Sequence, residues 1–182
     1  MNFIGEYQIS EEAVDELINY WNVNKANAED GRVGNGKLDE KVKKSLEIMI
    51  APEDLANLLY KDELLKCLKQ YTSKYKFADD VEFYGINHRP KIQYYDKGWG
   101  FYKWHIENDG NPRVINRHLV FSTYLNDVEN GGTKFLYQDY VTKARKGSTI
   151  IFPAGWTHAH KGQISENQEK YIITGWFNFL ET

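Results

Sequence analysis

The second half of the chain, residues 81–179, consists of short runs rich in β-branched and aromatic residues, and this pattern limits the fold more than any other feature. Turn sequences such as "DKG", "NDGNP", "ENGG" and "RKG" separate the runs. Short strands at regular spacing are typical of β-sandwiches and barrels, whereas a parallel sheet would need crossover helices that are missing here. The expected strands are VEFYGINH, KIQYYDKG, FYKWHIE, RHLVFSTYLND, GTKFLYQDY, STIIFPAG and KYIITGWFNF.

Helices are expected ahead of these strands. Ser10 can cap a first helix, whose apolar residues fall on one stripe: Val14, Leu17, Ile18 and Trp21. Residues 26–40 are polar, contain several glycines and asparagines, and are expected to form a loop.

A second helix is predicted from Pro52, which suits a first helical turn, to about Tyr75. Cys67 is expected to pack inside as a small hydrophobe. The buried side of this helix is expected to comprise Leu55, Leu58, Leu59, Leu65, Leu68 and Tyr71.

Size and charge exclude several classes of protein. The 182 residues suit one domain, and no apolar run approaches the 18 or so residues that span a bilayer. A net charge of −3 without a basic cluster disfavours nucleic acid as a partner. The single Cys67 and an N-terminus without signal-peptide features predict a cytoplasmic protein. The 15% aromatic content indicates a β-rich core or an aromatic-lined pocket.

The stretch "KWHIEND" places His105 and Glu107 one residue apart. On an extended strand such residues project to the same side, so an imidazole and a carboxylate would converge. The pair is either two ligands of a metal ion or an ordinary surface ion pair.

A later stretch supplies a third ligand. His158 and His160 follow a strand and a Pro-Ala-Gly turn. Two histidines and one carboxylate on one face of a metal, with open positions, are diagnostic of non-haem Fe(II) oxygenases. Structural zinc is less favoured, because it usually draws on cysteines.

From Lys91 to Phe179 the chain resembles the 2-oxoglutarate/Fe(II)-dependent dioxygenases, specifically the prolyl 4-hydroxylase-like branch with its small phage and bacterial members. That family's motif runs from a strand tyrosine through a glycine to His-x-Asp, and Tyr95, Gly98, His105 and Glu107 stand here in that order.

The carboxylate departs from the family pattern. Glutamate in place of aspartate adds one methylene group and shifts the bite on the metal, so Asp109 is an alternative ligand to Glu107. The family also places a basic residue about ten positions after the distal histidine. Lys170 stands ten residues after His160, which favours His160 over His158 as that ligand. His158 then lies beside the ligands, on the substrate side, or on the surface.

The resemblance implies roles for further residues. Lys170 would pair with the far carboxylate of 2-oxoglutarate, and Tyr124 and Tyr95 would help to bind that cosubstrate. Arg117 and Trp176 also occupy family positions and are candidates for contacts with substrate or ligands. Taken singly, each has an ordinary alternative: a solvated lysine at a strand end, or core tyrosines and tryptophan. His88 and His118 lack such partners and are expected to be structural.

The resemblance implies a mostly β fold with N-terminal helices: a double-stranded β-helix, or cupin-like jelly roll. It implies one dioxygenase domain over residues 1–182, with a helical support over 1–80 and the jelly-roll core over 81–182. The implied activity hydroxylates a C–H bond, in a prolyl or other residue of a peptide or protein, and releases succinate and CO2. It requires Fe(II), 2-oxoglutarate and O2, with ascorbate a further candidate. A phage-encoded member would act in the host cytoplasm.

Two other functions remain open at this point. One is a metal- or sugar-binding jelly roll without oxygenase activity, which needs no clamp for a dicarboxylate. The other is a nucleic-acid demethylase of the same superfamily, which the acidic net charge disfavours. Loops 26–40 and 76–90 are expected to form a substrate lid. Nothing in the sequence indicates the oligomeric state.

Overall fold

The computed structural model describes residues 1–33 and 36–180. Its helices are α1 (Glu11–Asn24) and α2 (Leu55–Lys74), with short 3-10 helices η1 (Lys25–Asn27), η2 (Lys76–Ala78) and η3 (Trp156–His158). Its strands are β1 (Gly5–Gln8), β2 (Glu29–Asp30), β3 (Leu46–Met49), β4 (Tyr84–Gly85), β5 (Lys91–Tyr95), β6 (Arg117–Tyr124), β7 (Thr133–Phe135), β8 (Tyr140–Val141), β9 (Ser148–Pro153), β10 (His160–Gly162) and β11 (Lys170–Phe179).

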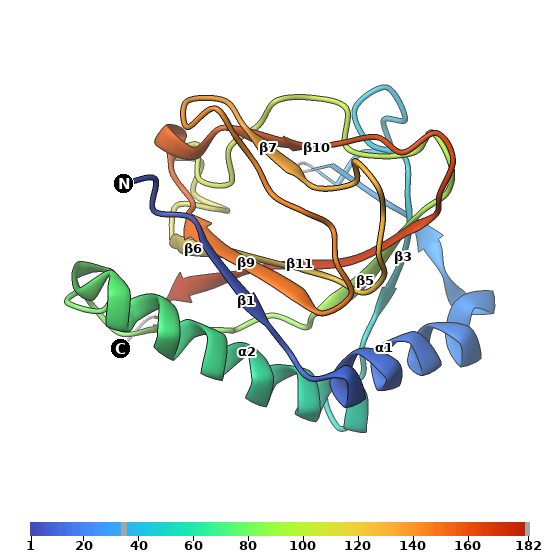
Figure 1. The fold of residues 1–182 in the computed structure, drawn as a ribbon, viewed down its shortest axis with the longest axis horizontal. Coiled ribbons are helices and arrows are strands. Elements are labelled where there is room, and N and C mark those ends of the chain that lie inside the picture. The colour runs from blue at the N-terminus through green and yellow to red at the C-terminus, as the bar shows by residue number, and fades with distance from the viewer. Residues whose placement is uncertain (34–35, 181–182) are drawn as a thin grey trace.

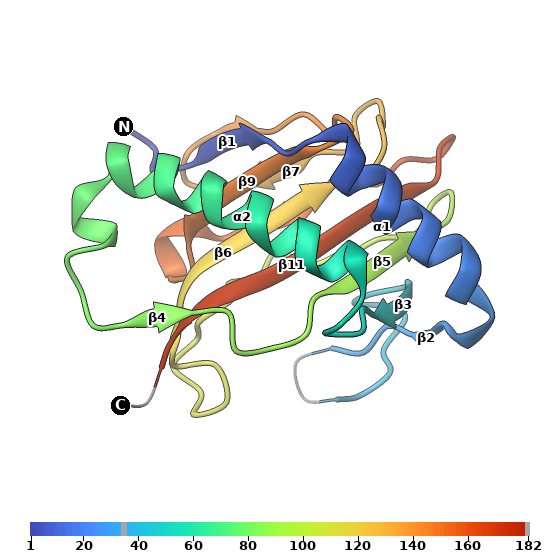
Figure 2. The ribbon, with the colours of Figure 1, turned by 90° about the horizontal axis from the view of Figure 1, so that it is seen from below.

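Two antiparallel sheets face each other, and both long helices cover the outer face of the larger one (Figure 1). In the described part of the chain, the larger sheet has the order β1-β9-β6-β11-β5-β3-β2, with β4 also paired to β11. The smaller sheet has the order β10-β7-β8. Seen from the helix side, α1 and α2 lie across the strands of the larger sheet (Figure 2). This confirms the predicted mostly β jelly-roll fold with N-terminal helices.

Helix α1 forms as predicted. The Ser10 hydroxyl accepts a hydrogen bond from the Ala13 amide at 3.3 Å, which satisfies one of the free N–H groups of the first turn. Val14, Leu17 and Trp21 are buried against the sheet, in agreement with the predicted stripe. None of the helices in the described part of the chain combines the length and apolar character needed to cross a bilayer.

Helix α2 was predicted correctly in part: Cys67 and Tyr71 are buried as expected, and Leu59 and Leu68 pack partly against the core, but the start and three leucines were wrong. It begins at Leu55, capped by Asp54, so Pro52 lies before the helix. Three of the leucines expected inside are more than half exposed: Leu55, Leu58 and Leu65. Besides the predicted Cys67 and Tyr71, the buried stripe contains Ala56, Asn57, Tyr60 and Leu64, which also recur at helical spacing. This helix has two apolar stripes, and the one that packs on the sheet contains the aromatic rings of Tyr60 and Tyr71.

The N-terminal region is less helical than predicted. Strands β1, β2 and β3 all precede residue 80 and pair into the large sheet, β1 with β9 and β3 with β5. The expected loop 26–40 overlaps the end of η1 and contains β2, and its residues 34–35 lie outside the described ranges. The predicted strand FYKWHIE is also absent as a strand, because it is held only by isolated bridges at Phe101 and His105.

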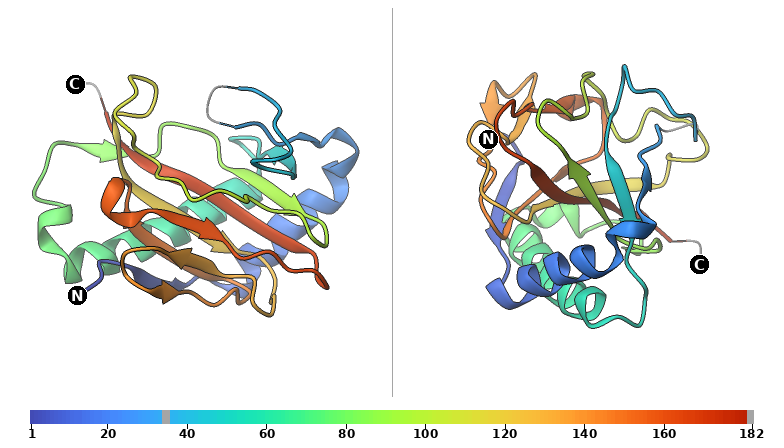
Figure 3. Two further views of the ribbon diagram at one scale, coloured as in Figure 1. Left: turned by 90° about the horizontal axis from the view of Figure 1, so that it is seen from above. Right: turned by 90° about the vertical axis from the view of Figure 1, so that its right-hand side faces the viewer.

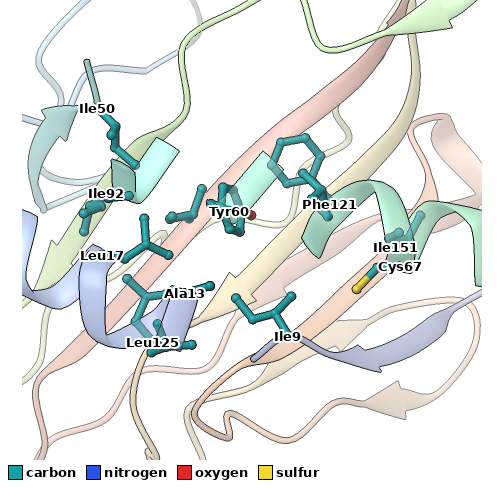
Figure 4. Close-up of a cluster of buried hydrophobic side chains, with 14 of the residues drawn as sticks. Ile9, Ala13, Leu17, Ile50, Tyr60, Cys67, Ile92, Phe121, Leu125 and Ile151 are labelled. Atoms are coloured by element: carbon teal, nitrogen blue, oxygen red, sulfur yellow. The ribbon is translucent and has the colours of Figure 1, made fainter. Parts of the chain in front are cut away.

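The central strands β5, β6 and β11 separate two environments by their alternation. On β11, Ile173 and Phe177 point toward the helices and lie in the main core, whereas Lys170 and Trp176 line the opposite side. Figure 4 shows the core between the sheet and the helices, where Tyr60 of α2 meets Phe121 of β6. Each of these strands therefore contributes side chains to the core on one face and to a cavity on the other.

Candidate active site

A cavity of about 700 Å³ opens between the two sheets, on the side away from the helices. This volume suits a small-molecule site. Alternate residues of the central strands form its floor, and the small sheet forms its opposite wall. The floor comprises Lys91, Gln93, Tyr95, Ser122, Tyr124, Lys170, Ile172, Thr174 and Trp176, and the wall includes Thr133, His160 and Gly162.

His105, Glu107 and His160 meet inside this cavity. Their nearest ligand atoms all lie within 4.8 Å of one another. Nε2 of His105 is 3.5 Å from Oε1 of Glu107, and Nε2 of His160 is 3.6 Å from the same oxygen. Backbone bonds between residues 105 and 160, in both directions, hold the two histidines side by side. Ligands at right angles around a divalent ion, with bonds of about 2.1 Å, lie roughly 3 Å apart, so this spacing fits one ion.

Backbone carbonyl groups determine which nitrogen of each histidine ring carries the hydrogen. Nδ1 of His105 lies 3.0 Å from the Lys103 carbonyl oxygen, and Nδ1 of His160 lies 2.9 Å from the His158 carbonyl oxygen. A carbonyl only accepts, so each Nδ1 donates. In the neutral imidazole each Nε2 then has a free lone pair directed at Glu107, which is how a metal-binding histidine is prepared. Phe101 stacks on the His105 ring at 3.9 Å and fixes its plane.

The second oxygen of Glu107 is already engaged. Arg117 and the indole of Trp176 each donate to Oε2 at 2.9 Å. Arg117 also donates to the Glu107 carbonyl oxygen at 2.8 Å. Burial by itself would raise the pKa of this carboxyl group, but hydrogen bonds and charge from His105 and His160, in the form that carries a proton on Nε2, hold the pKa well below its usual value. Glu107 is thus an anion that offers a single oxygen, Oε1, to the shared point.

The remaining candidates from the sequence lie outside this cluster. Asp109 is exposed, and its carboxylate accepts from the Asn111 amide in its own loop. His158 belongs to a different element from His160, because η3 ends at His158 and β10 begins at His160. The His158 ring is buried rather than on the surface, and its Nε2 lies 2.9 Å from the Asn2 carbonyl oxygen.

Lys170 lies at another end of the cavity and is only 5% exposed. Its ammonium group donates to the carbonyl oxygens of Gln163 at 2.8 Å and Gly131 at 3.2 Å. Among the described residues no carboxylate pairs with it. Burial lowers the pKa of Lys170 to about 8. A buried cation without an anionic partner is costly, and an anionic ligand would relieve that cost.

Tyr124 and Thr133 line the same cavity as this lysine. The Tyr124 hydroxyl lies 2.7 Å from the Thr133 hydroxyl and 3.2 Å from the Thr142 hydroxyl. The Tyr95 hydroxyl donates to Gln93 at 2.7 Å, so Tyr95 offers Lys170 the face of its ring, 5.4 Å from the ammonium group. Thr133 was not among the predicted site residues. It could have been predicted from its position, because it directly follows Gly131 and Gly132 at the start of a strand.

Gly132 allows the small sheet to close over this end. A Cβ atom at Gly132 would lie 1.8 Å from the Thr142 carbonyl oxygen, so any side chain would push the two segments apart. The Thr142 hydroxyl and amide both bond to Thr133 across this gap. Glycine is therefore required for the contact that positions Thr133 beside Tyr124.

The donor set fits a divalent first-row metal together with a dicarboxylate. Two neutral imidazoles and one carboxylate oxygen would leave half of an octahedral ion free. Lys170 would neutralise one carboxylate of the second ligand. The cavity thus has the parts for a metal-dependent reaction on a chelating organic acid.

The comparison with protein families agrees with this geometry. Residues 90–178 match the sequence model of the 2OG-Fe(II) oxygenase superfamily. The chain carries a 2OG-Fe(II) oxygenase domain. This confirms the predicted enzyme class, a 2-oxoglutarate-dependent dioxygenase, and its predicted cofactors Fe(II), 2-oxoglutarate and O2. None of the curated protein sequences matches the chain of this oxygenase.

Solved structures show where the same fold occurs. The oxygenase superposes on a prolyl-4-hydroxylase from Pseudomonas putida with a TM-score of 0.74 and 15% identity, over 100% of this chain and 95% of that one. A Trichoplax adhaerens prolyl hydroxylase, in complex with a peptide fragment of hypoxia inducible factor, superposes with a TM-score of 0.76 and 16% identity, over 98% of this chain and 84% of that one. The 2OG complex of a viral collagen prolyl hydroxylase from Paramecium Bursaria Chlorella virus-1 superposes with a TM-score of 0.71 and 18% identity, over 98% of this chain and 97% of that one.

Proposed function

We propose that this oxygenase hydroxylates a C–H bond of a prolyl residue in a peptide or protein. The overall reaction joins substrate, 2-oxoglutarate and O2, and yields hydroxylated substrate, succinate and CO2. The observation that carries the proposal is the presence, in one cavity, of the His105–Glu107–His160 cluster and the buried, uncompensated Lys170. The solved structures with this fold support a prolyl substrate, since those named above are prolyl hydroxylases.

In this proposal His105, Oε1 of Glu107 and His160 hold Fe(II). Bound Fe(II) supplies the redox chemistry with 2-oxoglutarate and O2. The chain's own contribution is orientation: the carbonyl groups of Lys103 and His158 keep Nε2 of each imidazole free, and Arg117 with Trp176 keep Glu107 to one ligand oxygen.

Lys170 would form a charge-assisted pair with the far carboxylate of 2-oxoglutarate. The Tyr124 hydroxyl can accept from its threonine partners and still donate its own proton to that carboxylate. Thr133 lines the same end of the cavity and adds a second hydroxyl. This arrangement fixes the length of the cosubstrate, because its far end must reach Lys170.

Succinate release from 2-oxoglutarate, measured with Fe(II) and O2 in the presence of proline-containing peptides, tests the proposal. His105→Ala, His160→Ala and Lys170→Ala are expected to abolish it. His118→Gln serves as the control, because the His118 ring bonds to the Ala78 carbonyl oxygen outside the cavity. Mass spectrometry of the peptide would locate the added oxygen. Turnover that adds no oxygen to any prolyl peptide, but adds it to another substrate, would reject the prolyl assignment and keep the enzyme class.

A further inference from the structure

The cavity carries more positive than negative charge, although the whole chain has a net charge of −3. Among the residues that the structure describes, two carboxylates line it, Glu107 and Asp109. The cationic side chains of the lining are Arg32, Lys43, Lys91, Arg113, Arg117 and Lys170. The positive character of the cavity is therefore local and does not follow from the composition.

Several of these cations already have partners. Arg117 pairs with Glu107 at 2.9 Å. Lys43 and Lys91 both pair with Glu47, one with each carboxylate oxygen. Since two lysines share one carboxylate, this group keeps one excess positive charge beside the cavity.

Arg32 and Arg113 are exposed, and no described carboxylate forms an ion pair with either. Arg32 donates to the Gly36 carbonyl oxygen at 3.1 Å, which leaves its charge uncompensated. Asp109 has a free charge of its own, but it also serves its loop by accepting from the Asn111 amide. The guanidinium groups of Arg32 and Arg113 are therefore available to a substrate.

The two arginines come from different loops. Arg32 follows β2, and Arg113 lies in the loop that leads into β6. Both loops lie along the same edge of the molecule (Figures 2 and 3). Both side chains line the cavity that contains the ligand cluster, so a substrate chain that enters from this edge meets them.

We infer that this oxygenase selects acidic peptides, in which carboxylates that flank the hydroxylated residue pair with Arg113 and Arg32. This inference rests on the proposed function and names its substrate class. Guanidinium groups suit carboxylates, because their parallel N–H donors match the two oxygens. The excess charge on Lys43 and Lys91 adds attraction over a longer range.

The same cations would attract nucleic acid, but the cavity favours a peptide. Single-stranded nucleic acid binds through bases stacked on free aromatic rings. Here the Phe101 ring stacks on His105, and the Trp176 ring is covered by Arg117. Carboxylates interrupt the positive surface at Glu47 and Asp109, which a continuous phosphate backbone would meet unfavourably.

Peptides with one central proline, flanked by runs of glutamate, glutamine or lysine, provide the test. Binding to the Mn(II)-loaded protein with 2-oxoglutarate, measured without O2, is expected to be about tenfold tighter for the glutamate peptide than for the glutamine peptide, and weakest for the lysine peptide. The difference should shrink as salt rises. Because binding is read without turnover, charge selectivity here would support the inference even if the prolyl hydroxylation assay failed.

Charge reversal locates the effect. Arg113→Glu and Arg32→Glu are each expected to weaken binding of the glutamate peptide roughly tenfold and to strengthen binding of the lysine peptide. The affinity ratio between the glutamate and lysine peptides should change much more than the affinity for 2-oxoglutarate. Arg145→Glu is the matched control, since this exposed arginine lies outside the cavity lining. Equal affinity for the three peptides, an equal loss in the control variant, or preference for a single-stranded oligonucleotide would each overturn the inference.

Discussion

The guanidinium group of Arg117 lies over the indole ring of Trp176, 3.5 Å from the ring centre, and both side chains donate to the same oxygen of Glu107. A glutamate is long enough to bind a metal through both oxygens, which would occupy a position that the reaction needs. Here the pair of donors retains Oε2. The extra methylene group of glutamate is thereby compatible with a three-ligand site.

Loss of this clamp is expected to weaken metal binding. Arg117→Met should lower the affinity for Fe(II) roughly 10- to 100-fold, the usual effect of removing a partner that orients a metal ligand. Arg117→Lys should recover part of it. The absorption spectrum of the Co(II)-loaded protein would report a change in ligand number, and circular dichroism would verify that the variant is folded. An unchanged spectrum and affinity in Arg117→Met would contradict the role assigned to the clamp.

Removal of the buried ammonium group is expected to affect binding and stability in opposite directions. Lys170→Met should weaken 2-oxoglutarate binding roughly 10- to 100-fold, because a charge-assisted hydrogen bond contributes about 1.5–3 kcal/mol. It should also raise the melting temperature of the protein without ligand, since no buried charge is left unpaired. Lys97→Met, at an exposed lysine after β5, is the control and should change neither. Thermal melts with and without 2-oxoglutarate measure both effects.

The pH dependence should identify the same lysine. Its folded-state pKa of about 8 lies below the usual value of 10.5, so the unfolded chain binds more protons between these two pH values. Stability without ligand should therefore rise with pH across this window, and 2-oxoglutarate affinity should fall. Urea midpoints of the wild type and Lys170→Met, compared from pH 7 to 10, isolate the contribution of Lys170 from that of the tyrosines. If the urea midpoints of the wild type and Lys170→Met changed with pH in parallel, Lys170 would not be the group responsible.

His88 should make the protein sensitive to acid. Burial, then the charge of Arg117, lowers the pKa of His88 to about 4, and its Nδ1 is buried without a partner. Stability should fall as pH drops from about 6.5 to 4, because the unfolded chain takes up a proton that the folded chain refuses. The loss amounts to a few kcal/mol, roughly 1.4 for each unit of pKa shift. His88→Phe, next to Phe121 and Trp176, should flatten the acid limb of a urea-midpoint profile. A profile as steep as that of the wild type would show that another group is responsible.

Much of the fold was predictable because alternation is local information. The runs that became β5, β6 and β11 place Tyr95, Tyr124 and Lys170 on one face through the period of two alone. Strands β1 and β3 were not predicted, because their sequences carry little pattern and each depends on a partner far along the chain. Helix α2 offered two apolar stripes, and only the sheet decides between them.

The site was predictable in composition but not in detail. His105 and Glu107 were found from their spacing, yet they converge from an irregular segment held by bridges rather than from a strand. The positions of His158 and His160 differ because η3 gives way to β10 between them, a change that no local pattern signals. Thr133 reaches the Tyr124 hydroxyl only because Gly132 allows the backbone to approach Thr142, which is a tertiary effect.

Strand β11 carries Lys170 near its beginning and Trp176 near its end, with Ile173 and Phe177 packed toward the helices between and beyond them. One rigid segment therefore sets the separation between the proposed cosubstrate anchor and the glutamate clamp. A loss of volume beneath it, far from any reacting atom, would shift both ends of the site together. Variation in the helix-facing core of this protein should consequently appear as altered coupling between 2-oxoglutarate consumption and substrate oxidation before it appears as unfolding.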